Sequence, residues 1–174
     1  MTFTKVEERL ALALRKLCDE QACLIKVDAN ERSITHHLAI YLQYEFTGWH
    51  VDVEYNRHFD DPKRQPRRPQ EPPRQPTPED TDAVTVFPDI IVHHRGTDQN
   101  NLLVVEVKKA SRDDPGDDYW KLEQFTKPLP EGYGYRWGVH VVLPAARGDA
   151  QRKTWFKNGV KCHERFASCQ DPQA

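Results

Sequence analysis

The sequence has few cysteines and no long apolar run. No stretch of its 174 residues approaches the roughly 20 apolar residues that cross a bilayer, so we predict no membrane partner. The first residues, MTFTKVEERLALALRKL, carry too many charges for a signal peptide, which favours a soluble cytoplasmic protein with reduced thiols. The cysteines form no CxxC pair, and with His163 their spacing matches no common zinc pattern; they are Cys18, Cys23, Cys162 and Cys169.

An excess of positive charge is absent as well. Lysine and arginine number 25 against 27 aspartates and glutamates, and the formal net charge is -2. This balance does not by itself indicate nucleic-acid binding, so any such binding must come from a local basic patch or from a metal ion. The length suits one domain, residues 1–174, that buries a sizeable core.

Apolar spacing predicts two N-terminal helices, at 4 to about 24 and at about 31 to 46, the second capped by Asp28 or Asn30. Alternating or continuous apolar residues predict the strands that follow. We expect strands at 49–56, 83–94, 102–110 and 136–144, a short helix at 117–126 and a last, charged helix at 149–158. This order indicates an α/β fold with a mixed four-stranded core sheet flanked by helices.

A proline-rich insertion interrupts this order at about residues 60–80. It contains seven prolines, several arginines and almost nothing apolar, so we expect an exposed, flexible loop. It could be a solvated insertion between strands or a mildly basic arm that contacts nucleic-acid backbone.

Charged residues occur within two of the predicted strands. If the hairpin turn centres between residues 97 and 98, Asp89 lies opposite Glu106 on the neighbouring strand. Lys108 then projects from the same face, because strand side chains alternate, and the valines beside Glu106 point to the other face. Charges in a buried strand are costly unless they are paired or bind a metal.

Two carboxylates and a lysine are sufficient for phosphodiester hydrolysis with a hard cation. Magnesium prefers oxygen ligands, often one or two carboxylates plus waters. The cation neutralises phosphate charge and activates water, and an ammonium group can orient that water or stabilise developing charge. Alternatively, Asp89 and Glu106 form a salt-bridged sheet surface with Lys108 and Lys109.

The residues Pro88-Asp89 and Glu106-Val107-Lys108 resemble the signature of the PD-(D/E)XK nuclease superfamily, which includes restriction endonucleases and Holliday-junction resolvases. The resemblance spans about residues 31 to 143, and the superfamily core, helix–strand–strand–strand–helix–strand, matches the expected elements. It implies a restriction-endonuclease-like fold and Mg²⁺ (or Mn²⁺) held by Asp89, Glu106 and the carbonyl of Val107. It also implies a catalytic role for Lys108.

Many members of this superfamily add a glutamate on the helix before the first strand, and Glu31 is the candidate here. Helical spacing aligns Glu31 with the apolar stripe of its helix, so it should face the sheet. The stretch from Asp28 to Glu31 is also a capping-box pattern, in which Glu31 would close the helix start. One residue can do both. Glu45 and Glu54 are alternative candidates for the additional glutamate.

Some members also carry a glutamine and, four residues later, a tyrosine on the helix after the triplet. Gln124 is followed by Pro128 at that spacing, so this pattern fails here. Lys121 and Gln124 could still reach phosphate as nucleic-acid-binding residues, or they could form the solvated face of their helix.

The leading hypothesis is a magnesium-dependent endonuclease that acts on DNA, with catalytic Asp89, Glu106, Lys108 and Glu31. The alternatives are a catalytically inactive nuclease-fold module that binds nucleic acid or protein, and a structural protein whose hairpin charges are salt bridges. No separate recognition domain is visible, so any specificity must come from loops, a homodimer or a recognition partner.

Overall fold

The computed structural model describes residues 1–27, 29–55, 57–58, 61–66, 83–110, 115–144 and 151–162. The helices in these ranges are α1 (Phe3–Glu20), α2 (Ala22–Lys26), α3 (Glu31–Glu45) and α4 (Gly116–Thr126). The strands are β1 (His50–Val53), β2 (Arg57–His58), β3 (Asp61–Pro62), β4 (Arg64–Pro66), β5 (Ala83–Thr85), β6 (Ile90–His93), β7 (Leu103–Lys109), β8 (Trp137–Leu143), β9 (Arg152–Lys157) and β10 (Val160–Lys161). Within these ranges, no helix has the length and apolar character needed to span a membrane.

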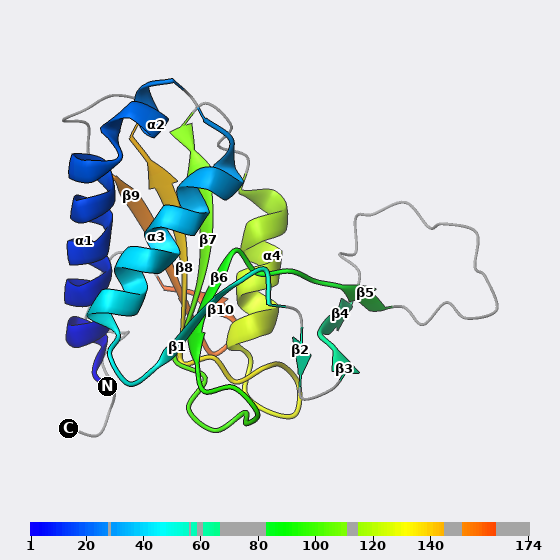
Figure 1. Ribbon diagram of the computed structural model, residues 1–174. Coiled ribbons are helices and arrows are strands. Elements are labelled where there is room, and N and C mark those ends of the chain that lie inside the picture. The colour runs from blue at the N-terminus through cyan, green and yellow to red at the C-terminus, as the bar shows by residue number, and fades with distance from the viewer. Residues whose placement is uncertain are drawn as a thin grey trace.

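Six strands of the described chain form one mixed sheet in the order β1-β6-β7-β8-β9-β10 (Figure 1). β7 and β8 are parallel, and the other neighbouring strands are antiparallel. The expected mixed α/β sheet is therefore confirmed, but it has six strands in the described residues rather than four. The two additional strands, β9 and β10, extend the edge beside β8.

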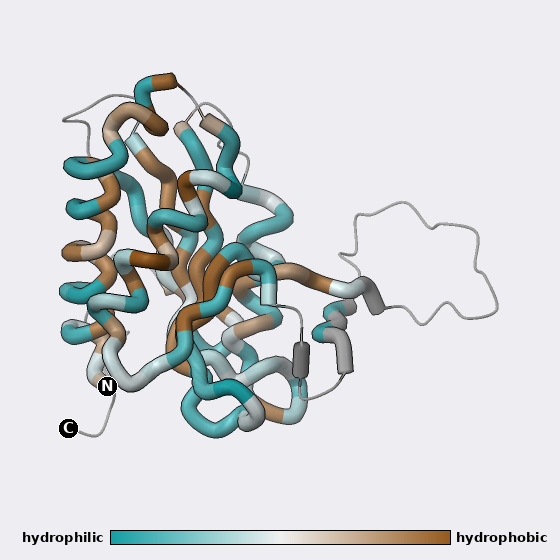
Figure 2. Tube along the Cα trace, viewed as in Figure 1, coloured by the Kyte–Doolittle hydropathy of each residue, from teal (hydrophilic) through white to brown (hydrophobic). Residues whose placement is uncertain are grey.

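Helices cover both faces of this sheet. α1 and α3 pack with alternate residues of β6, β7 and β8 in one apolar cluster, and Figure 2 shows the apolar side of α1 turned toward the strands. Leu10 and Leu14 of α1 are fully buried there, which stabilises the fold by roughly 1.5–3 kcal/mol for each side chain. On the other face, Leu122 and Phe125 of α4 pack on Ile91 and its neighbours.

The register of the β6–β7 hairpin matches the sequence prediction. Ile90 pairs with Val105, and continuing this register by one residue sets Asp89 opposite Glu106. The valines on either side of Glu106 pack in the cluster with α1 and α3. Glu106 itself contacts Lys121 of α4, on the opposite face. The alternation expected from strand geometry is therefore confirmed.

The helices predicted at 31–46 and 117–126 are confirmed as α3 and α4. Asn30 caps α3 by accepting a hydrogen bond from Ser33 N at 2.8 Å, while Asp28 lies outside the described residues. The first helix is shorter than expected, because α1 ends at Glu20 and α2 follows after Gln21.

The predicted last helix is wrong. Residues 152–157 form β9, which pairs with β8 and turns back into β10. The turn consists of Asn158 and Gly159, both with positive φ (53° and 76°). Asn-Gly is the preferred pair for this two-residue hairpin turn, so the local sequence did carry the signal.

Two strand predictions also need correction. The predicted strand at 83–94 is interrupted: β5 pairs with β4 in a separate two-stranded sheet, and β6 starts after Asp89 in the main sheet. In the predicted 49–56 strand, regular alternation would place Val51 and Tyr55 on one face, but they pack in the apolar clusters on opposite faces of the sheet. Glu54 lies between them with φ 49°, which breaks the alternation.

The expectation of a fully solvated insertion at 60–80 is wrong for its described part. Residues 61–66 contain β3 and β4, and Lys63 and Gln65 are buried. Residues 67–80 lie outside the described residues.

Candidate active site

The predicted site residues meet where α3 begins, β7 ends and α4 begins (Figure 1). Asp89 directly precedes β6, Glu106 and Lys108 lie on β7, and Glu31 is the first residue of α3. Three chain segments thus bring these four side chains to one end of the sheet. Glu45, at the far end of α3, does not lie with them.

Asp89 is held against the neighbouring strand by a backbone hydrogen bond. Its Oδ2 accepts from Val107 N at 2.8 Å, which orients the carboxylate toward β7. Burial raises the pKa of Asp89, and the Val107 hydrogen bond offsets part of this rise.

Glu106 is the most deeply buried acid of the group, with no exposed surface. Its Oε2 accepts from Lys121 Nζ at 3.0 Å, while its Oε1 is buried without a hydrogen-bond partner. Burial and the nearby Asp89 carboxylate raise the pKa of Glu106 well above its usual range. Because the neighbouring Asp89 charge disfavours the charged form of Glu106, a cation placed between the two carboxylates would be stabilised.

Lys108 lies between two carboxylates. Its Nζ is 3.2 Å from Asp118 Oδ2 and 3.4 Å from Glu31 Oε2. Burial alone would lower the pKa of Lys108, but the Asp118 and Glu31 charges outweigh burial and raise it. The amine is therefore protonated at neutral pH, and it can donate hydrogen bonds or stabilise negative charge rather than accept a proton.

Glu31 turns toward the site, as its helical position predicts. Its carboxylate contacts Lys108, whereas the side chain of Asn30 accepts the capping hydrogen bond of α3. As the first residue of α3, Glu31 also places its negative charge beside the helix N-terminus, which is favourable.

Two residues of the cluster escaped prediction, Asp118 and His140. Asp118 is buried in the first turn of α4 and contacts Lys108 and, at 3.4 Å, Lys121. His140 of β8 pairs with Glu106 in the parallel register, and its Nε2 lies 3.6 Å from Asp118 Oδ2. Although burial raises it, His140 and the two lysines lower the pKa of Asp118 to about 2. The Asp118 carboxylate is therefore charged at neutral pH, and it forms ion pairs with Lys108 and Lys121.

The two residues proposed to contact nucleic acid differ in their surroundings. Lys121 joins the cluster through Glu106 and Asp118. Gln124 is buried, and its Oε1 accepts from Lys127 Nζ at 2.8 Å. Contact of either residue with nucleic acid stays a prediction.

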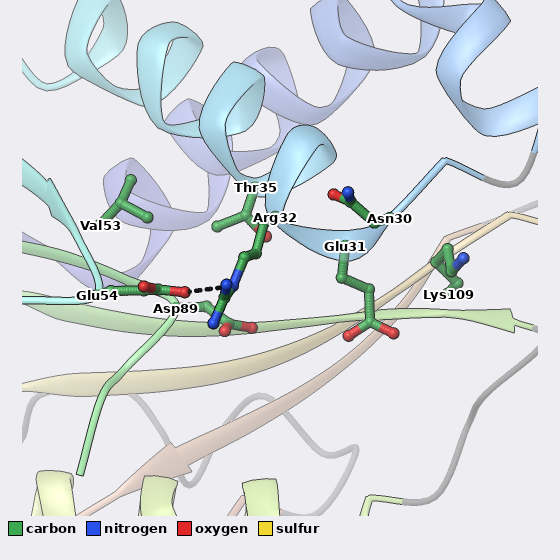
Figure 3. Close-up of a pocket in the computed structure, with 8 residues that line it drawn as sticks. All are labelled: Asn30, Glu31, Arg32, Thr35, Val53, Glu54, Asp89 and Lys109. Carbon is green, nitrogen blue, oxygen red and sulfur yellow. Dashed lines mark ion pairs between the residues drawn. The ribbon is translucent and has the colours of Figure 1, made fainter.

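A pocket of about 620 Å³ opens beside Asp89, and its lining residues are Asn30, Glu31, Arg32, Thr35, Val53, Glu54, Asp89 and Lys109. Figure 3 shows Arg32 reaching across it to Glu54, and their ion pair is 3.0 Å long. The Arg32 side chain is 86% exposed, so this guanidinium lies at the rim, within reach of a ligand in the pocket. Glu54, an alternative site residue, therefore lies beside Asp89 in the same pocket.

The donor set suits a hard cation with an incomplete protein shell. Within the described residues, no group of three or more histidine, cysteine, aspartate or glutamate side chains is arranged to hold a metal ion. The buried Oε1 of Glu106, which lacks a partner, and the adjacent Asp89 carboxylate still fit an ion such as Mg²⁺, which keeps several waters. Cys169 and His163, considered for zinc, lie outside the described residues.

Comparison of the chain with protein-family models, curated proteins and solved structures finds no match. The functional interpretation of the cluster therefore depends on its own geometry and on the motif resemblance.

Proposed function

We propose that this protein is a metal-dependent nuclease that hydrolyses phosphodiester bonds in DNA, on a restriction-endonuclease-like core. The observation that carries the proposal is the position of Asp89 opposite Glu106, with a buried Glu106 oxygen that has no partner. The order α3-β1-β6-β7-α4-β8 supports the proposed core, since it follows the order that the motif resemblance implies.

Asp89, Glu106 and the carbonyl of Val107 would hold the metal ion. When bound, Mg²⁺ or Mn²⁺ supplies charge neutralisation at the phosphate and activation of the attacking water. Glu31 lies one contact away through Lys108, so it would assist by fixing that lysine.

Lys108 would act as a positioned cation. Because Asp118 and Glu31 keep its amine protonated, it can orient the attacking water by a hydrogen bond and stabilise the negative charge that develops on the phosphoryl group. It would not serve as the general base, since its proton is held by two carboxylates.

The exposed guanidinium of Arg32 would contact a substrate phosphate at the rim of the pocket, because arginine matches phosphate geometry well. Sequence or structure specificity would come from loops, a homodimer or a recognition partner.

The test is nicking of supercoiled plasmid DNA with Mg²⁺ by the wild-type protein and by the Asp89→Ala and Lys108→Ala variants. We expect nicking by the wild-type protein and loss of nicking in both variants. Equal cutting by the three proteins would reject the assignment. Lys5→Ala, an exposed substitution on α1, is the matched control and should cut like the wild type.

A second candidate is a nuclease-fold module that binds DNA or protein without cleaving. The contact that favours it is the 3.0 Å pair of Lys121 with Glu106, in which an ammonium group occupies the carboxylate that would bind metal. Calorimetric titration with Mg²⁺ separates the two functions. A binding signal that is lost in Glu106→Ala supports the nuclease, whereas DNA binding with no metal signal supports the module.

A further inference from the structure

Lys63 buries its charged end, which is unusual for lysine. Only 3% of the residue is exposed, and its amine lies among aromatic rings rather than in water. A lysine that merely covers apolar surface with its stem keeps the ammonium group in solvent. In this protein the ammonium group of Lys63 is itself buried and in contact with aromatic rings.

Four rings surround this ammonium. The distances from Lys63 Nζ to the ring centroids are 5.3 Å for Tyr55, 5.9 Å for Phe125, 5.8 Å for Tyr133 and 5.4 Å for Tyr135. All lie within the range of about 6 Å over which a ring face attracts a cation. The Nζ also donates a hydrogen bond to Tyr135 Oη at 3.2 Å.

The rings are held in place by one another. The ring centroids of Phe125 and Tyr133 are 5.2 Å apart, and those of Phe125 and Tyr135 are 5.7 Å apart in an edge contact. Phe125 and Tyr135 are fully or almost fully buried. The positions of these aromatic rings therefore do not depend on Lys63 alone.

The occupant is charged at neutral pH. Burial lowers the pKa of Lys63 to about 8, while the charges of Asp98 and Asp52 oppose this lowering. The amine thus keeps its proton at pH 7, and the ring faces interact with a cation.

The contact of Lys63 with these four rings also attaches residues 61–66 to α4, which carries Phe125. Lys63 O accepts from Val86 N at 3.1 Å, and Gln65, two residues further along the chain, donates from Nε2 to Lys121 O of α4 at 3.3 Å. In Figure 1, β4 and β5 lie on the right-hand side of α4, the helix that also carries Asp118.

We propose that Tyr55, Phe125, Tyr133 and Tyr135 form a binding site for an alkylammonium group, that Lys63 is its resident ligand, and that this occupancy fastens residues 61–66 to α4. The site takes primary or methylated ammonium groups, since aromatic faces bind both. The proposal does not depend on nuclease activity.

Chemical complementation tests the site. Thermal unfolding of Lys63→Ala is measured with tetramethylammonium chloride, with sodium chloride at equal ionic strength, and with neutral tert-butanol. We expect tetramethylammonium alone to raise the Tm of Lys63→Ala, to leave the wild-type protein and Lys5→Ala unchanged, and to lose its effect when Tyr55→Leu is added. An equal response of the wild-type protein, or an equal effect of tert-butanol, would overturn the proposal.

A second measurement does not require the alanine variant to fold well. Lys63→Met keeps most of the stem and removes the charge. Hydrogen exchange of the Val86 amide, which bonds to Lys63 O, should accelerate about thirtyfold, the loss expected for a desolvated cation–π contact. Unchanged exchange in Lys63→Met would show that the ammonium does not fasten the segment.

Discussion

Replacing Glu106 with glutamine should stabilise the protein when no divalent metal is present. The wild-type carboxylate is fully buried, is repelled by Asp89 and leaves Oε1 without a partner. Glutamine keeps two polar atoms at this position but carries no charge, so it avoids the burial penalty and the Asp89 repulsion that the carboxylate suffers. Glu106→Gln should therefore raise the free energy of unfolding at pH 7 by about 1–3 kcal/mol. For a domain of this size, Tm rises by about 2–4 °C for each kcal/mol.

The pH dependence has a definite sign. Because the pKa of Glu106 is raised in the folded state, that state holds the proton more tightly than the unfolded state does. Wild-type stability should therefore fall as the pH rises above 4.5, the usual value, and Glu106→Gln should lack this fall. Urea unfolding at several pH values measures the difference.

Magnesium should reverse the order of stability. A cation at 100 times its Kd stabilises the folded wild-type protein by about 2.7 kcal/mol, whereas Glu106→Gln has lost one of the two carboxylates and should gain little. The reasoning is refuted if Glu106→Gln is the less stable protein without metal, or if Mg²⁺ stabilises both proteins equally.

Three further predictions concern the surroundings of the site. Lys108→Met should still bind Mg²⁺ in calorimetry but lose plasmid nicking in a gel assay, while the exposed Lys5→Met should keep Mg²⁺ binding and nicking. Loss of Mg²⁺ binding in Lys108→Met would count against a purely electrostatic role of Lys108. Asp118→Asn should lower the free energy of unfolding at pH 7 by about 2 kcal/mol, a difference that disappears as the pH falls from 3.8 through about 2, because the folded-state pKa of Asp118 is lowered. Gly138→Ala should cost about 1–3 kcal/mol, because its Cβ would meet Thr126 Cγ2 at 2.9 Å; unchanged urea unfolding would show that α4 can shift instead.

The central residues of the site could be predicted because local rules determine them. Alternation along β7 places Glu106 and Lys108 on one face, and the length of the hairpin sets Asp89 opposite Glu106. Helical spacing likewise predicted that Glu31 faces the sheet, and its carboxylate does contact Lys108 there. Each of these positions depends only on residues close in the sequence or on the length of one hairpin turn.

The remaining site residues depend on which strands lie side by side. His140 reaches the cluster because β8 pairs in parallel with β7, which places it beside Glu106. Asp118 follows a polar, turn-prone segment and resembles an ordinary solvated helix start. One signal was nevertheless present, since His140 is a polar residue in an otherwise apolar seven-residue strand, and such a residue needs a partner.

The buried position of Lys63 had no comparable local signal. Three of its four rings come from residues 125, 133 and 135, which are far from it in the sequence, and its own segment is rich in proline and arginine. Composition therefore predicted solvent exposure, and only the tertiary arrangement buries the amine.

The central claim is that Asp89 and Glu106 share one divalent cation. Anomalous diffraction from crystals grown with Mn²⁺ tests this claim most directly, because it locates the ion itself. The account predicts one anomalous peak between the two carboxylates, within coordination distance of Glu106 Oε1, with Lys121 displaced from Glu106. No peak at that position, with Lys121 still paired to Glu106, would contradict it.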